Sequence, residues 1–186
     1  MPIKNEGSGT NKSLDSSWFL CQYGKIMNIF VLDADPKVSA QLMCDKHCVK
    51  MILESAQMLC SAYPEGDAPY KRTHFNHPCS KWIRDSVDNY EWLLSHAYGL
   101  VDEYFDRYSK IHKSLDAIQW CDDHSYTLAL PDIGLTPFAQ AMPDEYKHSD
   151  PVVAYQTYYV NDKKYFAKWK NGKTPTFMLD SSLLVA

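Results

Sequence analysis

Apolar residues recur every three or four positions over most of the chain, which is the period of amphipathic helices. The longest such pattern spans roughly residues 80–113 and consists of Ile83, Val87, Tyr90, Leu94, Ala97, Val101, Phe105 and Tyr108. Shorter helical patterns cover about residues 36–62, 116–123 and 151–160. The spacing predicts a mainly α fold, a compact single-domain helical bundle with at most one short strand near the N-terminus.

The strand candidate is the apolar run Asn28 to Leu32, which is rich in β-branched and aromatic residues and predicts a buried strand or extended segment. Residues 1–26 begin with a polar stretch and lack the long apolar core of a signal peptide. We therefore expect a flexible N-terminal extension over 1–26 and one helical domain over 27–180. Proline and glycine predict loops at about 63–69 and 130–143.

Composition narrows the class of protein. The 186 residues are 45% hydrophobic, which fits a folded domain with a substantial core, and no apolar run reaches the roughly 20 residues of a membrane span. A net charge of −4 disfavours coating of nucleic acid through bulk electrostatics but permits a local basic patch. The six cysteines lack paired short spacings, so we expect reduced thiols and a cytoplasmic location.

The helical pattern after residue 45 carries a polar stripe opposite a wide apolar face. The stripe consists of Lys46, His47, Lys50, Glu54, Gln57 and Ser61, and the apolar face consists of Cys48, Val49, Ile52, Leu53, Ala56, Leu59 and Cys60. The apolar face predicts a buried helix whose stripe faces water or a cleft. Two lysines one turn apart depress each other's pKa, which favours imine chemistry, and His47 and Glu54 can shuttle protons. The alternative is a solvated face with a Lys50–Glu54 ion pair.

Two other clusters admit a metal or a structural interpretation. Asp33 and Asp35 follow the apolar run and can hold Mg²⁺, or can instead form a turn and cap a helix that starts at Pro36. The segment His74-Phe75-Asn76-His77-Pro78-Cys79, together with Cys44 and Cys48, offers zinc-ligand types without the usual pair spacing. We therefore expect no metal and no cofactor, and predict that His74, Asn76 and His77 line the same cleft as the polar stripe.

The C-terminal region combines positive charge with aromatic rings. Its five lysines are Lys163, Lys164, Lys168, Lys170 and Lys173, and its rings are Tyr165, Phe166 and Trp169. Such a segment can contact phosphates and stack on bases. Equally, the rings can fill the core while the lysines stay in water.

Most of residues 27–170 resembles a group of phage-encoded proteins. The resemblance runs through Met27 to Pro36, Cys44 to His47, Thr73 to Cys79, Trp82 to Arg84, Asn89 to Trp92 and Gly134 to Ala139. A few residues are also similar to the phage pyrimidine-dimer DNA glycosylases of the endonuclease V type. Those enzymes are small and mainly α, with Asp-x-His on a first helix and a catalytic Glu seven residues after the His. Asp45-Lys46-His47 and Glu54 match that pattern.

The glycosylase resemblance implies that an amine attacks the sugar C1′ and forms an imine as the base leaves, while Glu54 stabilises the intermediate and shuttles protons. The family uses an N-terminal α-amine, and the matching residue here is Asn28, which follows Met27 within the chain. The family's arginines on this helix are absent, since Leu53 and Gln57 stand near the expected places. Three alternatives follow: the chain is processed before Asn28, Lys50 is the substitute amine, or the catalytic activity has been lost or changed.

These observations predict a DNA- or nucleotide-directed N-glycosidic enzyme. The expected catalytic residues are Asn28, His47, Lys50 and Glu54, and the expected substrate contacts are Lys46, Gln57, His74, Asn76, His77, Arg84, Lys163, Lys164 and Trp169. The expected partner is DNA or a nucleotide, with no membrane involved. Two alternatives remain: a non-catalytic phage module that binds a nucleotide or a protein, and a metal-dependent phosphodiesterase.

Overall fold

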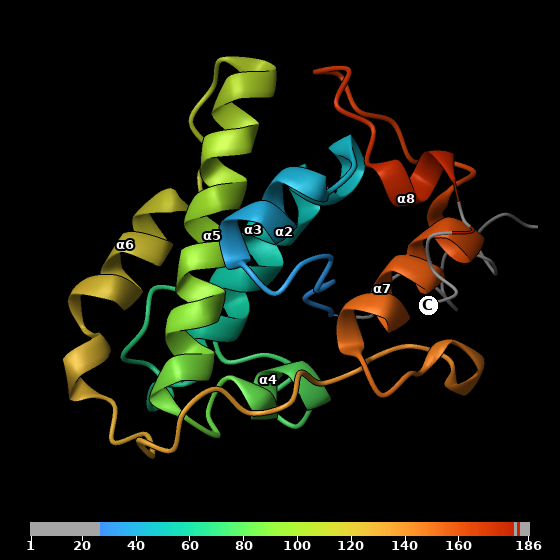
Figure 1. The fold of residues 1–186 in the computed structure, drawn as a ribbon. Helices are drawn as coiled ribbons and strands as arrows, with labels where there is room; N and C mark the ends of the chain where they lie inside the picture. Colours follow the sequence, from blue (N-terminus) through green and yellow to red (C-terminus); the bar gives the residue numbers. More distant parts are fainter. Residues whose placement is uncertain (1–26, 181, 183–186) are drawn as a thin grey trace, which may run out of the picture.

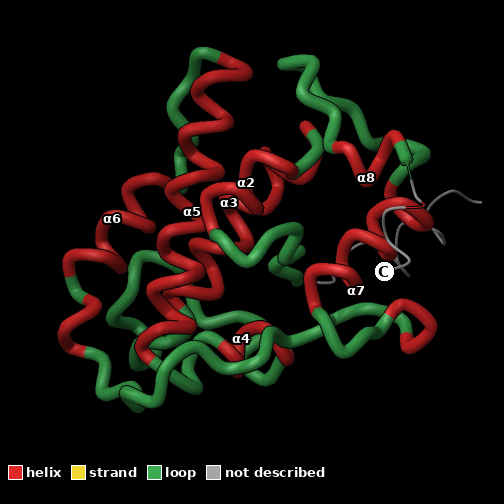
Figure 2. Tube along the Cα trace, in the orientation of Figure 1, coloured by secondary structure: helices red, strands yellow, loops and turns green. Residues whose placement is uncertain are grey.

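The computed structural model describes residues 27–180 and residue 182. Within that part of the chain every regular element is helical and no strand occurs (Figure 2). The helices are α2 (Pro36–Leu42), α3 (Asp45–Cys60), α4 (Pro78–Trp82), α5 (Val87–Tyr108), α6 (Leu115–Asp123), α7 (Pro151–Tyr158) and α8 (Thr176–Leu179), with 3₁₀ turns η1 (Ser125–Thr127) and η2 (Asp144–Tyr146) and a π-helical turn η3 (Tyr159–Lys163). The mainly α class is confirmed, whereas the extension expected over 1–26 lies outside the described residues.

The long helix α5 forms the centre of the bundle, and α2, α3 and α6 pack against it (Figure 1). Gly99 permits the close approach of α5 to α2, because a Cβ at this position would lie only 3.0 Å from Cβ of Ala40. The same hydrophobic core extends to the C-terminal helices through Tyr155, Tyr159 and Phe177. The first and last thirds of the chain therefore share one core.

The helix predicted over about residues 80–113 is wrong in its length, since α4 ends at Trp82 and α5 begins only at Val87. Ser86 caps α5 by accepting a hydrogen bond from the Asn89 backbone N–H at 3.1 Å. The Asn89 side chain donates to the carbonyl oxygen of Trp82 at 2.7 Å, which satisfies an acceptor at the end of α4. Apolar periodicity continues across this break, so it could not reveal the two helices.

Burial along α3 differs from the prediction on both sides of the helix. Val49 and Leu53, expected in the core, are 38% and 41% exposed. His47 and Glu54, expected to face water or a cleft, are 7% and 8% exposed. The reason is tertiary: the segment before α2 and the turn η3 cover the polar side of α3, as the contacts described below show.

The apolar segment Met27 to Leu32 is buried, as predicted, but it pairs with no strand in the described part of the chain. Its backbone groups bond to side chains instead. The N–H of Leu32 donates to Ser39 Oγ at 3.0 Å, and the carbonyl oxygen of Leu32 accepts from Gln156 Nε2 at 2.9 Å. A side chain on α2 and another on α7 thereby fix this segment between the two helices.

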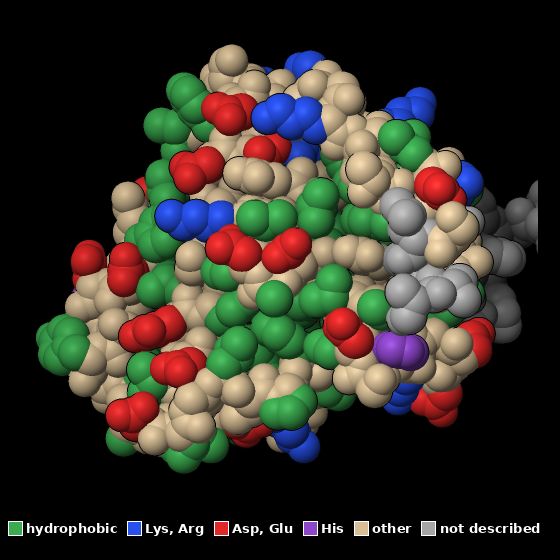
Figure 3. All heavy atoms as spheres, viewed as in Figure 1, with side chains coloured by type: hydrophobic (Ala, Val, Ile, Leu, Met, Phe, Trp, Pro, Cys, Tyr) green, Lys and Arg blue, Asp and Glu red, His purple; other side chains and the backbone are tan. Residues whose placement is uncertain are grey.

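The predicted loop over residues 130–143 is present, and it runs past α4 on its way to α7 (Figure 1). Within this loop, the carbonyl oxygen of Ala141 accepts a hydrogen bond from the Asn28 side chain. In the residues that the structure describes, no helix is long and apolar enough to cross a membrane. On the face seen in Figure 3, acidic side chains are scattered over the side formed by α5 and α6, and lysine or arginine side chains lie mostly apart from one another.

Candidate active site

Asn28 lies at the centre of the candidate site because it contacts three separate segments. Its backbone nitrogen donates to Glu54 Oε2 on α3 at 3.3 Å. Its side-chain Nδ2 donates to the carbonyl oxygen of Ala141 at 2.8 Å, and its Oδ1 accepts from the Tyr155 hydroxyl at 2.8 Å. The nitrogen of Asn28 is therefore fixed beside a carboxyl group.

Glu54 is a buried carboxyl group with a cationic partner. Its Oε1 lies 3.0 Å from Lys50 Nζ, one turn earlier on α3. Burial raises the pKa of Glu54, and the Lys50 ammonium, the Asn28 N–H and the charge of His74 oppose this shift only in part. The carboxyl group thus keeps its proton to a higher pH than an ordinary glutamic acid, which suits a general acid.

His47 occupies an aromatic environment. Its ring stacks on Phe30, with the centroids 4.4 Å apart, and its Nδ1 lies 2.6 Å from the Tyr159 hydroxyl. Burial, reinforced by the charges of Lys163, Lys50 and Lys46, lowers the pKa of His47 to about 3. The imidazole is therefore neutral at physiological pH.

Phe30 has an unusual backbone conformation that serves this arrangement. Its φ is 55°, in the left-handed region that bulky residues rarely adopt. The ring lies between His47 and Tyr158, with centroid distances of 4.4 Å and 6.1 Å. Such strain costs on the order of 1–3 kcal/mol and persists where surrounding packing enforces it, often at functional sites.

The loop before α4 contributes His74 near Glu54. His74 lies close enough for its charge to lower the pKa of Glu54. His77 caps α4, because its Nδ1 accepts from the Cys79 N–H at 3.2 Å, and burial together with the charge of His74 lowers the pKa of His77. Asn76 is exposed on this loop.

The remaining predicted contacts lie around this centre rather than in it. Lys46 is exposed, with Nζ 4.9 Å from the Phe166 ring centroid, and Gln57 is half-buried. Lys163 Nζ donates to the Tyr158 hydroxyl at 2.9 Å, and Lys164 is exposed. The indole of Trp169 donates to the Leu42 carbonyl oxygen at 3.1 Å and packs against the core. Of the rings of the C-terminal segment, Phe166 and Trp169 thus pack against the core, whereas Tyr165 is 86% exposed and most of the lysines face solvent.

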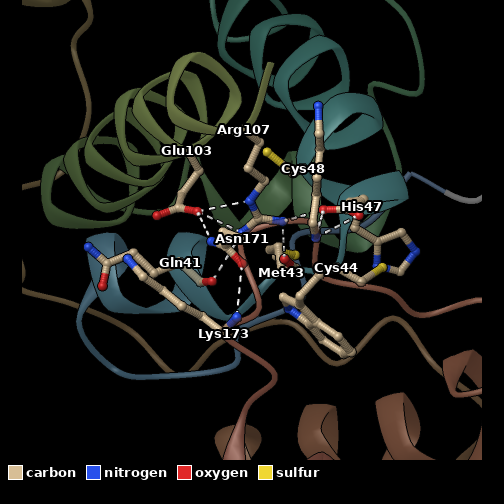
Figure 4. Close-up of polar contacts among 12 residues, drawn as sticks. Gln41, Met43, Cys44, His47, Cys48, Glu103, Arg107, Asn171 and Lys173 are labelled. Atoms are coloured by element: carbon tan, nitrogen blue, oxygen red, sulfur yellow. Dashed lines mark hydrogen bonds and ion pairs between the residues drawn. The ribbon is translucent and has the colours of Figure 1, made fainter. Parts of the chain in front are cut away.

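A buried arginine ties this segment to α3, a role that the sequence pattern did not predict. Arg107 bonds Glu103 at 2.7 Å and Asp45 at 3.2 Å, and also donates to the Met43 carbonyl oxygen at 2.8 Å (Figure 4). Asp45 in turn accepts from the Lys170 N–H at 3.0 Å. Asp45 therefore anchors the chain, which is a structural role for the first residue of the Asp-x-His pattern.

Tyr155 is a second residue that the sequence analysis missed. Its hydroxyl donates a hydrogen bond to Oδ1 of Asn28, a residue 127 positions earlier in the chain. Burial raises the pKa of this hydroxyl well above its ordinary value. One tyrosine among the chain's 13 carries no local signal of such a contact. Only the packing of α7 against the N-terminal segment reveals it.

Two sets of residues were candidates for a metal site, and the aspartates among them have local structural roles instead. Asp35 caps α2 by accepting from the backbone N–H groups of Lys37 and Val38, and Asp33 accepts from the Asp35 N–H at 2.8 Å. Among the described residues, no group of three or more His, Cys, Asp or Glu side chains is arranged to hold a metal ion. Five cysteines in that part of the chain are buried free thiols: Cys44, Cys48, Cys60, Cys79 and Cys121.

The fold and this site define a small helical protein with a buried acid beside a main-chain nitrogen. Residues 27–116, just under half of the chain, match the family model described as pyrimidine dimer DNA glycosylase. The chain is thus similar to these glycosylases over the segments that carry Asn28, Glu54 and the loop before α4, which supports a glycosylase-like enzyme. No curated protein and no solved structure matches the chain.

Proposed function

We propose that this protein is a DNA N-glycosylase whose reactive centre is the Asn28 nitrogen and the Glu54 carboxyl group. The observation that carries the proposal is the 3.3 Å contact between these two groups. It brings together the two residues that the glycosylase resemblance assigns to the nucleophile and the acid–base group. The match to the pyrimidine dimer glycosylase family supports DNA as the substrate.

The proposed reaction begins when a free amine at Asn28 attacks C1′ of the target nucleotide. The C1′–N bond to the base breaks, the base leaves with one of the two protons of the amine, and the sugar ring opens at O4′ to give an imine. Glu54 receives a proton from the attacking nitrogen and returns one to O4′. The imine also permits β-elimination of the 3′ phosphate, which would be the lyase step.

The nitrogen of Asn28 is an amide in the uncut chain, so this reaction requires a chain that begins at Asn28. Lys50 is the alternative amine, because its Nζ lies 3.0 Å from Glu54 Oε1 and its side chain is half exposed. We assign His47 to positioning rather than to proton transfer, since it is neutral and enclosed by aromatic rings. His74, Asn76 and His77 are proposed to contact the substrate from the adjoining loop.

The test is release of bases from ultraviolet-irradiated duplex DNA by the full chain and by chains that begin at Met27 or at Asn28. Glu54→Gln should slow base release by at least about 100-fold, because loss of general acid–base catalysis typically costs 10²–10⁴-fold. Thermal stability should barely change, because the amide is neutral and similar in shape.

Glu91→Gln is the matched control, since Glu91 is an exposed carboxylate on α5, and it should leave base release unchanged. Base release by the Glu54→Gln variant at the wild-type rate would contradict the proposal. Absence of base release from every chain would favour the non-catalytic module expected as an alternative. The cytoplasmic location and the phage origin stay predictions.

A further inference from the structure

Two of the three arginines in the chain lie on the same aromatic ring. Cζ of Arg72 is 4.4 Å and Cζ of Arg84 is 3.8 Å from the ring centroid of Phe75. Phe75 is 37% exposed, so this cluster stands at the surface of the loop that leads into α4. The third arginine, Arg107, is buried and bonded to Glu103 and Asp45.

The two guanidinium groups are held by the backbone but are not fully hydrogen-bonded. Arg72 Nη2 donates to the Tyr63 carbonyl oxygen, and Arg84 Nη2 donates to the Phe75 carbonyl oxygen at 2.7 Å. Arg72 Nε and Arg84 Nη1 are buried nitrogens that have no hydrogen-bond partner among the residues described by the structure. Unpaired buried donors are uncommon in native proteins and require an explanation.

The positive charges of this pair are also uncompensated. Among the described residues, neither arginine forms an ion pair. Burial and the charge of Arg72 lower the pKa of Arg84, and the charge of Asp85 offsets only part of this effect. Two adjacent cations without a carboxylate partner form a site for an anion that can accept several hydrogen bonds.

The position of the cluster connects it to the candidate active site. His74 lies between Arg72 and Phe75 in the sequence, has a φ of 49°, and lies close enough to Glu54 for its charge to lower the pKa of that carboxyl group. The loop before α4 therefore contributes both His74, whose charge influences Glu54, and Arg72 and Phe75 of the arginine cluster.

We propose that Arg72 and Arg84, stacked on Phe75, bind a phosphodiester group of the DNA strand whose nucleotide enters the Glu54 site. This inference rests on the proposed function for the identity of the strand. A phosphodiester offers two non-bridging oxygens that can accept paired hydrogen bonds from the planar guanidinium fork, and arginine meets this geometry better than lysine. The cation–π contacts with Phe75 hold the two side chains in place before DNA binds.

The experiment is a binding titration at several salt concentrations with a fluorescein-labelled duplex that contains a tetrahydrofuran abasic-site analogue, which cannot react. For the Arg72→Gln/Arg84→Gln double variant, the magnitude of the slope of log K against log salt should fall by about 0.9, the contribution of one neutralised phosphate. The Lys110→Gln/Lys113→Gln double variant removes two exposed charges from the segment that follows α5 and should keep the wild-type slope. A purely structural role for the arginines would also leave the slope unchanged, which would overturn the proposal.

If the arginine variant does not fold, as judged by circular dichroism, the wild-type chain provides the test. Phenylglyoxal modifies arginine, and the chain holds only Arg72, Arg84 and the buried Arg107 as targets. Saturating duplex should protect Arg72 and Arg84 from modification, and equal modification with and without duplex would overturn the proposal.

Failure of this inference is distinguishable from failure of the proposed function, because binding and base release are measured separately. An unchanged salt slope together with Glu54-dependent base release would refute only the proposed phosphate site. A reduced slope for the double arginine variant, without base release by the wild-type chain, would refute only the proposed glycosylase activity. A wild-type chain that does not bind the duplex would overturn the phosphate site.

Discussion

Two helical turns separate His47 from Glu54 on α3, and both side chains are almost fully buried. Around His47 lie the rings of Phe30, Tyr159 and Phe166, whereas Glu54 has an ammonium group and a backbone N–H as partners. Burial shifts both pKa values toward the neutral form. The imidazole is thereby made inert near neutral pH, and the carboxyl group is made more basic.

The comparison shows that burial of an ionisable group does not by itself indicate catalysis. The ring of His47 fills space between rings and makes one hydrogen bond to Tyr159, which is a packing role. Glu54 keeps an ion pair with a half-exposed lysine and faces the nitrogen of Asn28, which leaves it a route for protons. The proposed reactive centre therefore lies at Glu54, in the middle of α3. His47, in the first turn of the same helix, contributes packing rather than chemistry.

The comparison of His47 with Glu54 predicts its largest effect on the free energy of unfolding. His47→Ala should lower the free energy of unfolding by about 3 kcal/mol, because it leaves a cavity between aromatic rings. The rate of base release per folded molecule should fall much less than in Glu54→Gln. Urea denaturation and single-turnover kinetics measure the two quantities.

Val49→Ala, at an exposed position on the same helix, is the matched control and should change stability little. Loss of base release equal to that of Glu54→Gln, in a His47→Ala protein that is still folded, would break the distinction between the two residues.

A smaller effect is expected on the pH dependence of stability. The pKa of His47 is about 3 in the folded protein against an ordinary value of 6.5, so between these values the unfolded chain binds a proton that the folded chain does not. The free energy of unfolding should therefore decrease as pH falls below 6.5, by about 1.4 kcal/mol per pH unit from this residue.

His47→Gln should remove this contribution and flatten the curve measured by urea denaturation at a series of pH values. His96 supplies an internal comparison, since burial lowers its pKa to about 4 and its contribution should persist in the variant. Identical pH slopes for wild type and His47→Gln would show that His47 is not held neutral.

The sequence allowed the helical class, the loops and the buried N-terminal segment to be predicted, because these follow from local periodicity and from proline and glycine. It did not allow the exposed and buried sides of α3 to be predicted, since Val49 and Glu54 differ in burial only through the segments that cover them. The contacts of Asn28 with Ala141 and Tyr155 join residues more than 110 positions apart, beyond any local pattern. The two alternatives for the C-terminal lysines stayed open for the same reason.

The most direct test of the Asn28–Glu54 centre is borohydride trapping on ultraviolet-irradiated duplex DNA, followed by mapping of the modified residue by mass spectrometry. The chain that begins at Asn28 should form a covalent adduct at its α-amine. Lys50→Arg should retain that adduct, because arginine keeps the charge beside Glu54 but cannot form the imine. An adduct on Lys50, or base release without any adduct, would contradict the assignment of Asn28 as the nucleophile.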